Sequence, residues 1–386
     1  MSSGSAGGEA PSLAEIIREW GRIGVVGFGG PPAHVALFRD LCVARKGWIG
    51  AERFEDAIAA TNLLPGPGST QLAIFCAWRL RGLPGALLGG AAFIVPGLVA
   101  ILALSVLFLA SAPPTWVVGA GAGAGAAVAA VAVQAGAGLV PSSWERARLT
   151  HPLRWMTYAV LGLAAAATLG PWLVLVLLGC GAYELLMRRP GAVTAANGWA
   201  ILPLAAATGG VGALVWVAFK VGALSYGGGF VIVPLMQADA VDNYHWMTSS
   251  QFLNAVALGQ VTPGPVTHTV AAVGYAAAGV GGALLASLVA FAPSFSFILI
   301  GAERFDRLRS NPRARAFLEG AGPAAIGAIL GSAVPLSLAL SETWQLFVLA
   351  AAAVALLVLR RGVVVTLVAA GAGGAVLALA GAPLSG

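Results

Sequence analysis

The sequence predicts an all-α polytopic membrane protein with two inverted-topology repeats, broken helices and re-entrant helical hairpins. Three observations predict it: an apolar composition, glycine- and proline-rich breaks that occur twice, and arginine-rich loops that alternate between the two halves. Of the 386 residues, 59% are hydrophobic and 9% are charged, and the mean hydropathy is +0.88. Soluble proteins carry about 25% charged residues. Water is therefore not the main solvent of this chain.

Apolar runs long enough to cross a hydrocarbon core of about 30 Å recur along the chain. In lipid the backbone must satisfy its own hydrogen bonds, so these runs are expected to be helices. The expected spans are residues 83–110, 116–140, 155–169, 172–187, 280–301, 343–359 and 362–381.

The two kinds of break in the chain are each repeated. Phe28-Gly29-Gly30 recurs as Tyr226-Gly227-Gly228, and Pro65-Gly66-Pro67 recurs as Pro263-Gly264-Pro265, both at a shift of 198 positions. After a one-residue deletion the shift becomes 197 and Pro96 falls on Pro293. A register shared over this distance indicates two copies of one fold.

The repeat divides the chain into four parts. Residues 13–190 and 208–386 form the two transmembrane repeats, and residues 191–207 form the linker. Residues 1–12 are rich in Ser and Gly and are expected to be a disordered tail, since they lack the apolar core of a signal peptide.

Arginine placement predicts how the repeats are oriented. The connector 39–53 carries Arg39, Arg45, Lys46 and Arg53, whereas its counterpart 239–251 has no Lys or Arg. In the opposite sense, residues 304–315 hold five arginines and their counterpart, 109–115, holds none. Under the positive-inside rule the two halves therefore face opposite ways. Inverted repeats are typical of secondary transporters, whose substrate sites lie where broken helices meet near the midplane.

The same rule constrains the second break. If 39–53 and Arg79/Arg81 are both cytoplasmic, residues 51–80 cannot cross once and must form a helical hairpin with Pro65-Gly66-Pro67 at its tip. The equivalent hairpin, 249–278, would enter from the outside. The path through 27–32 is left open between a broken span and another hairpin.

The breaks have the chemistry of an anion site. Pro67 suits a first helical turn, so that Gly68, Ser69 and Thr70 offer N–H and hydroxyl donors at a positive helix terminus. Thr267 and His268 do the same in the second half. The alternative is that the breaks only allow close packing, which is how the small residues of 119–127 are interpreted.

Few charged residues accompany the breaks. Arg22 and Lys220 are matched basic residues that would balance the charge of an anion, or else lie at an interface. His34 and His268 follow breaks and could carry protons, although a lone histidine is more often a satisfied hydrogen-bonding group. No catalytic set, metal-ligand spacing or cofactor motif is visible, and we expect neither an enzyme nor a cofactor.

The candidate substrate-binding residues come from the four breaks and the polar residues beside them. They are Arg22, Phe28, Gly29, Gly30, Asn62, Pro65, Gly66, Pro67, Gly68, Ser69, Thr70, Gln71, Lys220, Tyr226, Gly227, Gly228, Gln260, Pro263, Gly264, Pro265, Thr267 and His268.

The stretches "GFGGPPAHVALF", "NLLPGPGSTQLAI", "ALSYGGGFVIVPLMQ" and "GQVTPGPVTHTVAAVGY" resemble the chromate ion transporter family in its fused two-domain form. The resemblance covers nearly the whole chain. It implies a multi-pass protein of the inner membrane that exports chromate, coupled to protons or the membrane potential, and so gives chromate resistance. The family's FGG element falls on residues 28–31 and 226–229. The chain departs from the family pattern at Gln71, where an acidic residue is common, and at Tyr226, where Phe is common.

Two alternatives to chromate export stay open. One is a carrier of sulfate or another oxyanion, and the other is an anion channel with the hairpin tips as its filter. The lipid bilayer is an expected partner and a homodimer is left open. Nucleic acid is not expected, because the basic residues lie in short loops between apolar runs.

Overall fold

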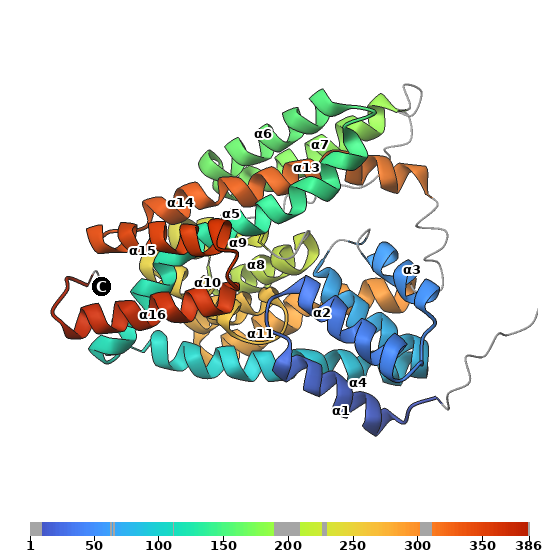
Figure 1. The fold of residues 1–386 in the computed structure, drawn as a ribbon, viewed down its shortest axis with the longest axis horizontal. Helices are drawn as coiled ribbons and strands as arrows, with labels where there is room; N and C mark the ends of the chain where they lie inside the picture. The colour runs from blue at the N-terminus through green and yellow to red at the C-terminus, as the bar shows by residue number, and fades with distance from the viewer. Residues whose placement is uncertain are drawn as a thin grey trace, which may run out of the picture.

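The computed structural model describes residues 10–61, 64, 66–110, 112–188, 209–225, 230–301 and 311–384, and every regular element within these ranges is a helix (Figure 1). The expected linker at 191–207 and residues 1–9 of the expected tail lie outside the described residues.

The first half contains a series of helices that recurs in the second. They are α1 (Leu13–Val26), α2 (Pro31–Arg39), η1 (Asp40–Arg45), α3 (Ala51–Thr61), α4 (Gly68–Phe108), α5 (Thr115–Ala147), α6 (Pro152–Thr168), η2 (Gly170–Trp172) and α7 (Leu173–Met187). The second half has α8 (Gly210–Leu224), α9 (Ile232–Gln237), η4 (Ala238–Asn243), α10 (Ser249–Val261), η5 (Val266–His268), α11 (Thr269–Gly301), α13 (Pro312–Gly331), α14 (Ala333–Leu338), α15 (Thr343–Ala353), η7 (Val354–Val358) and α16 (Val363–Leu379).

The repeat extends to unusual local structure. The π-helical segments η1 and η4 begin at Asp40 and Ala238, which are 198 positions apart, as are the first residues of α3 and α10. Further on, α5 and α13 begin 197 positions apart, at Thr115 and Pro312. The two halves therefore share one order of elements.

The first break, at 27–30, is the tip of a helical hairpin, which answers the question left open by the sequence. The Trp20 ring on α1 lies 5.3 Å from the Phe38 ring on α2. Lys46, just beyond η1, binds Glu15 in the first turn of α1 at 2.8 Å. Residues before and after the break therefore run antiparallel, and both ends of the hairpin return to the same side.

The hairpin predicted for residues 51–80 is also present, formed by α3 and the first part of α4. That part ends at a sharp turn, where Gly82 has a φ of +58° that glycine adopts without strain. Beyond the turn the chain reverses direction and packs against the first part of α4. The close approach of Gly89 to Ala77 shows this, since a Cβ added at Gly89 would lie 2.5 Å from the Ala77 side chain. Gly279 makes the matching turn in α11, with a φ of +61°.

The helices have the length and surface of membrane spans. Among the described residues, four helices are long and apolar enough to cross a membrane, and α7, α8, α15 with η7, and α16 are shorter apolar helices. Large apolar side chains face outward, including Val99 (61% exposed) and Leu288 (71%). Such surface suits lipid rather than water. The protein is an all-α polytopic membrane protein.

The two halves interleave. Helix α16 packs along α5, and α13 packs between α6 and α7, so that the last helices of each half cover the long helix of the other (Figure 1). Small residues allow this: a Cβ at Gly119 would lie 2.5 Å from the Gly374 carbonyl oxygen, and one at Gly162 would lie 1.8 Å from that of Ala324. The interpretation of 119–127 as a packing face is confirmed.

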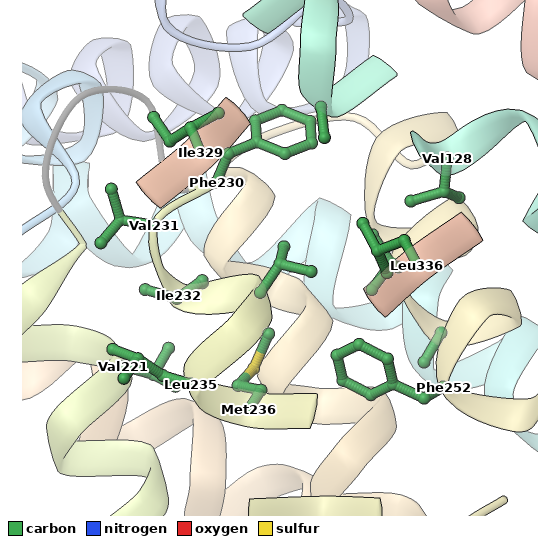
Figure 2. Close-up of a cluster of buried hydrophobic side chains, with 14 of the residues drawn as sticks. Val128, Val221, Phe230, Val231, Ile232, Leu235, Met236, Phe252, Ile329 and Leu336 are labelled. Atoms are coloured by element: carbon green, nitrogen blue, oxygen red, sulfur yellow. The ribbon is translucent and has the colours of Figure 1, made fainter. Parts of the chain in front are cut away.

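The two halves differ in burial around the first kind of break. Figure 2 shows Val231, Ile232 and Leu235 of the second half inside a hydrophobic cluster, where each is at most 1% exposed. In the first half the counterparts of Val231 and Leu235, which are Ala33 and Leu37, are partly exposed, although His34 at the position of Ile232 is buried. Correspondingly, α10 packs against α5, whereas α3 has no comparable contact with α13. A cavity lies between α3 and α13, where this contact is missing.

Candidate functional site

A cavity of about 1470 Å³ runs from the hairpin tips to a ring of arginines. Ligand pockets usually measure about 300–1,000 Å³, so this space is a vestibule with a binding region at its inner end rather than one fitted pocket. The predicted site residues that line it are Phe28, Gly29, Gly30, Gly66, Gly68, Ser69, Gln260 and Gly264.

The hairpin tips of the two halves meet at the inner end. The Gly264 N–H donates a hydrogen bond of 2.9 Å to the Gly27 carbonyl, which joins the second break of one half to the first break of the other. In the reciprocal contact, the second break of the first half lies against α8 of the second half, since a Cβ at Gly66 would be 3.2 Å from the Gly222 carbonyl oxygen. The breaks at Gly27, Gly66 and Gly264 and the C-terminal part of α8, although far apart in sequence, therefore lie close together in the fold.

Helix α4 presents its N-terminus to the cavity. Pro67 is its N-cap residue and makes no side-chain capping bond, and its carbonyl accepts the N–H groups of Thr70 and Gln71 at 3.0 Å each. The N–H groups of Gly68 and Ser69 have no acceptor within the helix, and both residues line the cavity. The positive end of the helix and these donors suit an anion.

Each half ties its first break to the turn that follows its second. In the first half the buried His34 ring bridges them, with Nδ1 at 3.1 Å from the Ser69 Oγ and Nε2 at 2.9 Å from the Gly27 carbonyl. In the second half the Ser225 hydroxyl lies 3.5 Å from that of Thr267. Hydroxyl groups are thus held at both tips.

Several predicted residues lie behind the cavity wall. Pro67, Thr70, Gln71, Pro263, Pro265, Thr267 and His268 do not line the cavity. Among the described residues, the Thr70 Oγ1 is buried without a hydrogen-bond partner. The His268 ring nitrogens face the Ile94 carbonyl without forming a hydrogen bond of good geometry. These polar groups surround the tips but do not reach the open space.

The two matched basic residues are not brought to the cavity. The Arg22 side chain is 51% exposed and lies 3.4 Å from Glu19 on the outside of α1. Lys220 is buried and forms an ion pair with Asp239. The predicted residues Asn62, Pro65, Tyr226, Gly227 and Gly228 lie outside the described residues.

The sequence analysis missed the residues at the mouth of the cavity. The arginines that line it are Arg146, Arg154, Arg188, Arg315, Arg360 and Arg361. Of these arginines, Arg315 belongs to residues 304–315, a segment whose arginines indicated the orientation of the repeats. What brings them together is the interleaving of the halves, which places the end of α5, the start of α13 and the α15–α16 loop around one opening.

Glu184 organises part of this mouth. Its carboxylate is 3% exposed, accepts the Tyr158 hydroxyl at 2.8 Å and lies 3.0 Å from Arg188 and 3.6 Å from Arg154. Arg188 also pairs with Glu319 on α13. A carboxylate within an apolar run is the signal that could have found this network.

The arginines of the mouth exceed its acids. Within the described part of the chain, six arginines and two glutamates line the cavity, and Arg146, Arg315, Arg360 and Arg361 form no ion pair. No group of three or more potential metal ligands occurs among the described residues. A wide cationic opening that narrows to hydroxyl and N–H donors can attract and hold a small anion.

Comparison with known proteins agrees with this chemistry. The chain is 33% identical to a chromate transport protein of Cupriavidus metallidurans over 343 residues, which cover 84% of the chain and 83% of the relative. It is 29% identical to a probable chromate transport protein of Synechococcus elongatus, with 85% of each chain covered, and to a chromate transport protein of Pseudomonas aeruginosa, with 86% and 82% covered. No solved structure matches the chain at a significant level.

The family match covers both halves separately. The profile described as chromate transporter matches residues 14–185 and again residues 212–376, the two segments that the internal repeat separates. With this match and a relative that is 33% identical over most of its length, the chain belongs to the chromate transporter family.

Proposed function

We propose that this protein is a secondary active transporter that exports chromate across the inner membrane and thereby gives chromate resistance. The observation that carries the proposal is the cavity, whose arginine-rich mouth leads to the α4 N-terminus and the hydroxyl of Ser69. The names of the relatives supply the substrate: chromate is a tetrahedral dianion that accepts hydrogen bonds on every oxygen.

The electrostatics of the cavity support an anion over a cation. The described lining residues carry four more arginines than glutamates. Low-dielectric walls lined by one sign of charge concentrate the opposite ion and raise its rate of arrival. Four of these arginines form no described ion pair, so their charge is directed to the cavity and to solvent. At the inner end, Gly68, Ser69 and Gln260 offer N–H and hydroxyl donors to a bound anion.

The repeats support alternating access. Equivalent helices α5 and α13 run antiparallel, since Gly136 of α5 lies against Leu330 of α13 while Arg146 and Arg315 both reach the cavity mouth. This is the relation expected of inverted-topology repeats. Under the positive-inside rule we assign the arginine-rich mouth to the cytoplasmic side, and on this assignment the cavity is open inward, as export requires.

Flux measurements with purified protein in liposomes test the proposed function. A carrier shows saturable chromate uptake that rises when chromate is present on the opposite side, whereas an anion channel gives neither saturation at low concentration nor such acceleration. Competition with sulfate and molybdate then decides between chromate and another oxyanion as the preferred substrate. A protein that moves no oxyanion under a proton gradient or a membrane potential would contradict the proposal.

Gly66→Ala tests the location of the site. Gly66 has a φ of +116°, and an added Cβ would lie 2.6 Å from the Gln71 Nε2, so that alanine must displace the tip from which α4 starts. We expect kcat/KM for chromate to fall by about tenfold or more, since small misplacements of a binding group are costly. The matched control is Gly281→Ala, because a Cβ there meets nothing within 4 Å. Normal transport by Gly66→Ala would place the site elsewhere.

A further inference from the structure

His34 is a buried titratable side chain in contact with Ser69 of the proposed anion site. It lies on α2 just after the first break, is 0% exposed, and its ring stands edge-on to Phe93 with centroids 5.1 Å apart. Both nitrogens are engaged: Nε2 with the Gly27 carbonyl at 2.9 Å and Nδ1 with the Ser69 Oγ at 3.1 Å. Ser69 lines the cavity, whereas His34 does not.

The partners of the ring determine where its protons lie. A carbonyl oxygen only accepts hydrogen bonds, so Nε2 must carry a proton and donate it to Gly27. In neutral His34, Nδ1 is then an acceptor, and the Ser69 hydroxyl must donate its single proton to it. Ser69 consequently has no proton left for an anion in the cavity and presents only lone pairs to it.

Protonation of His34 reverses this hydrogen bond. With both ring nitrogens protonated, Nδ1 donates to the Ser69 Oγ. The hydroxyl proton of Ser69 is then free to point into the cavity. The site gains one hydrogen-bond donor and one positive charge, and both favour a dianion. The neutral form disfavours the same ligand through the lone pairs of Ser69.

We propose that His34 takes up one proton each time the anion binds, and that this step couples anion transport to protons. A hydronium ion in the cavity gives its proton to the Ser69 Oγ and becomes water, as the former hydroxyl proton passes to Nδ1, so that His34 gains one proton and Ser69 keeps one. The proposal rests on the proposed function, because it assigns the coupling residue of the same site. His34 acts through Ser69 and is a positioning residue.

The surroundings single out His34 for this role. Of the titratable groups that face it, His268 in η5 is near enough to interact electrostatically. Within the described residues, no carboxylate, Lys or Arg contacts the ring from α1, α2 or α4. The equivalent position in the second half is Ile232, and there Ser225 reaches Thr267 directly. The stoichiometry follows as one proton per anion, not two.

The first test counts protons on the wild-type protein. Chromate is added to purified protein in detergent with weak buffer at about pH 8, where the added chromate is already a dianion, and a pH-sensitive dye records proton uptake. We expect about one proton per chromate bound. Chromate binding without proton uptake overturns the inference and leaves the proposed function intact, whereas absence of chromate binding contradicts the proposed function itself.

The second test is the pH profile of His34→Gln. Glutamine can occupy the same hydrogen bonds but does not titrate between about pH 6 and 8. The KM for chromate is measured in wild type and variant at each pH, so that the ionisation of chromate cancels in the ratio. The ratio of the variant's KM to the wild-type KM should be largest at low pH, where His34 is already protonated in the free wild-type protein. At pH values where His34 of the free protein is neutral, the ratio should fall by up to about tenfold per pH unit. A ratio that does not change with pH overturns the inference.

The controls separate a proton-linked effect from a folding effect. His245→Asn removes an exposed histidine that hydrogen-bonds the Val241 carbonyl, and asparagine tolerates the φ of +51° at this position. It should retain the wild-type pH profile and proton count. Ser69→Ala keeps the histidine but removes the hydroxyl that links it to the cavity, and should lose proton uptake on binding. Full proton uptake by Ser69→Ala or by His34→Gln overturns the inference.

Discussion

Lys220 shows how its surroundings decide the role of a single charged side chain. The sequence predicted it as a charge that balances the substrate, because it lies in an apolar segment one to two turns before a break. In the structure it pairs with Asp239 and lies 5.5 Å from the centre of the Trp216 ring. Asp239 also accepts a hydrogen bond of 3.2 Å from Asn243. A buried charge that is already neutralised holds α8 against η4 and does not act in the cavity.

Lys220→Met should therefore damage stability rather than affinity. It leaves the Asp239 carboxylate buried without its partner, which costs about 3–5 kcal/mol. Adding Asp239→Leu should recover most of this loss, since an apolar pair of similar size is often neutral. Thermal unfolding in detergent and the KM for chromate are the measurements. A stable Lys220→Met variant with a raised KM would show instead that Lys220 contacts the substrate.

At the level of the elements, the breaks were predictable and the local detail around them was not. Glycine and proline pairs, together with the loop arginines, indicated the hairpin over 51–80, and the structure contains it. The π-helical segments η1 and η4 carry no sequence signature, because their extra residue is accommodated by packing rather than by composition. The path through 27–30 depended on contacts such as Trp20 with Phe38, which no local pattern encodes.

The α15–α16 loop should guide the anion into the cavity. Replacing Arg360 and Arg361 by Gln removes two unpaired charges from the mouth. It should raise the KM for chromate several-fold at low salt with little change in kcat, because the proposed tip site is untouched. The difference should shrink near 1 M salt, where the screening length falls to about 3 Å.

Arg148→Gln is the matched control for these loop arginines. Arg148 follows Arg146 by two residues but does not line the cavity. Its removal should leave the KM and its salt dependence close to wild type. An equal effect of Arg148→Gln would mean that overall charge, rather than the mouth, governs uptake.

At the level of the whole molecule, the repeats are similar in elements but differ in contacts. Helix α10 lies against α5, where a Cβ at Gly125 would be 3.0 Å from the Leu253 Cβ. The equivalent residues of the other half are Gly322 (125 + 197) and Glu55 (253 − 198). Gly322 lines the open cavity instead of contacting α3. Two repeats of one fold in two arrangements are what alternating access requires.

Exchange of these arrangements can be detected by cysteine pairs. In a background where Cys42, Cys76 and Cys180 are replaced by Ala, Gly125→Cys with Leu253→Cys should form a disulfide in the state described here. Gly322→Cys with Glu55→Cys should form one only in the opposite state, and a fully formed bond in either pair should stop chromate exchange. Mass spectrometry after oxidation measures each bond, with single-cysteine variants as controls. An active protein whose second pair never crosslinks under turnover would rule out the exchange.

The sequence by itself determined the helical membrane fold, the repeat at a shift of 198 positions and the breaks that form the inner end of the cavity. Composition, the positive-inside pattern and the backbone preferences of glycine and proline are local properties, and they are legible in one dimension. Only the tertiary structure decided which polar groups share the cavity. It brought Arg146 and Arg361 to one mouth, paired Lys220 with Asp239 and placed His34 behind Ser69. The shared mouth arises from helices of the two halves packing across each other, whereas the other two contacts arise from folding within one half, over 19 and 35 positions. None of these contacts leaves a trace in the local sequence pattern.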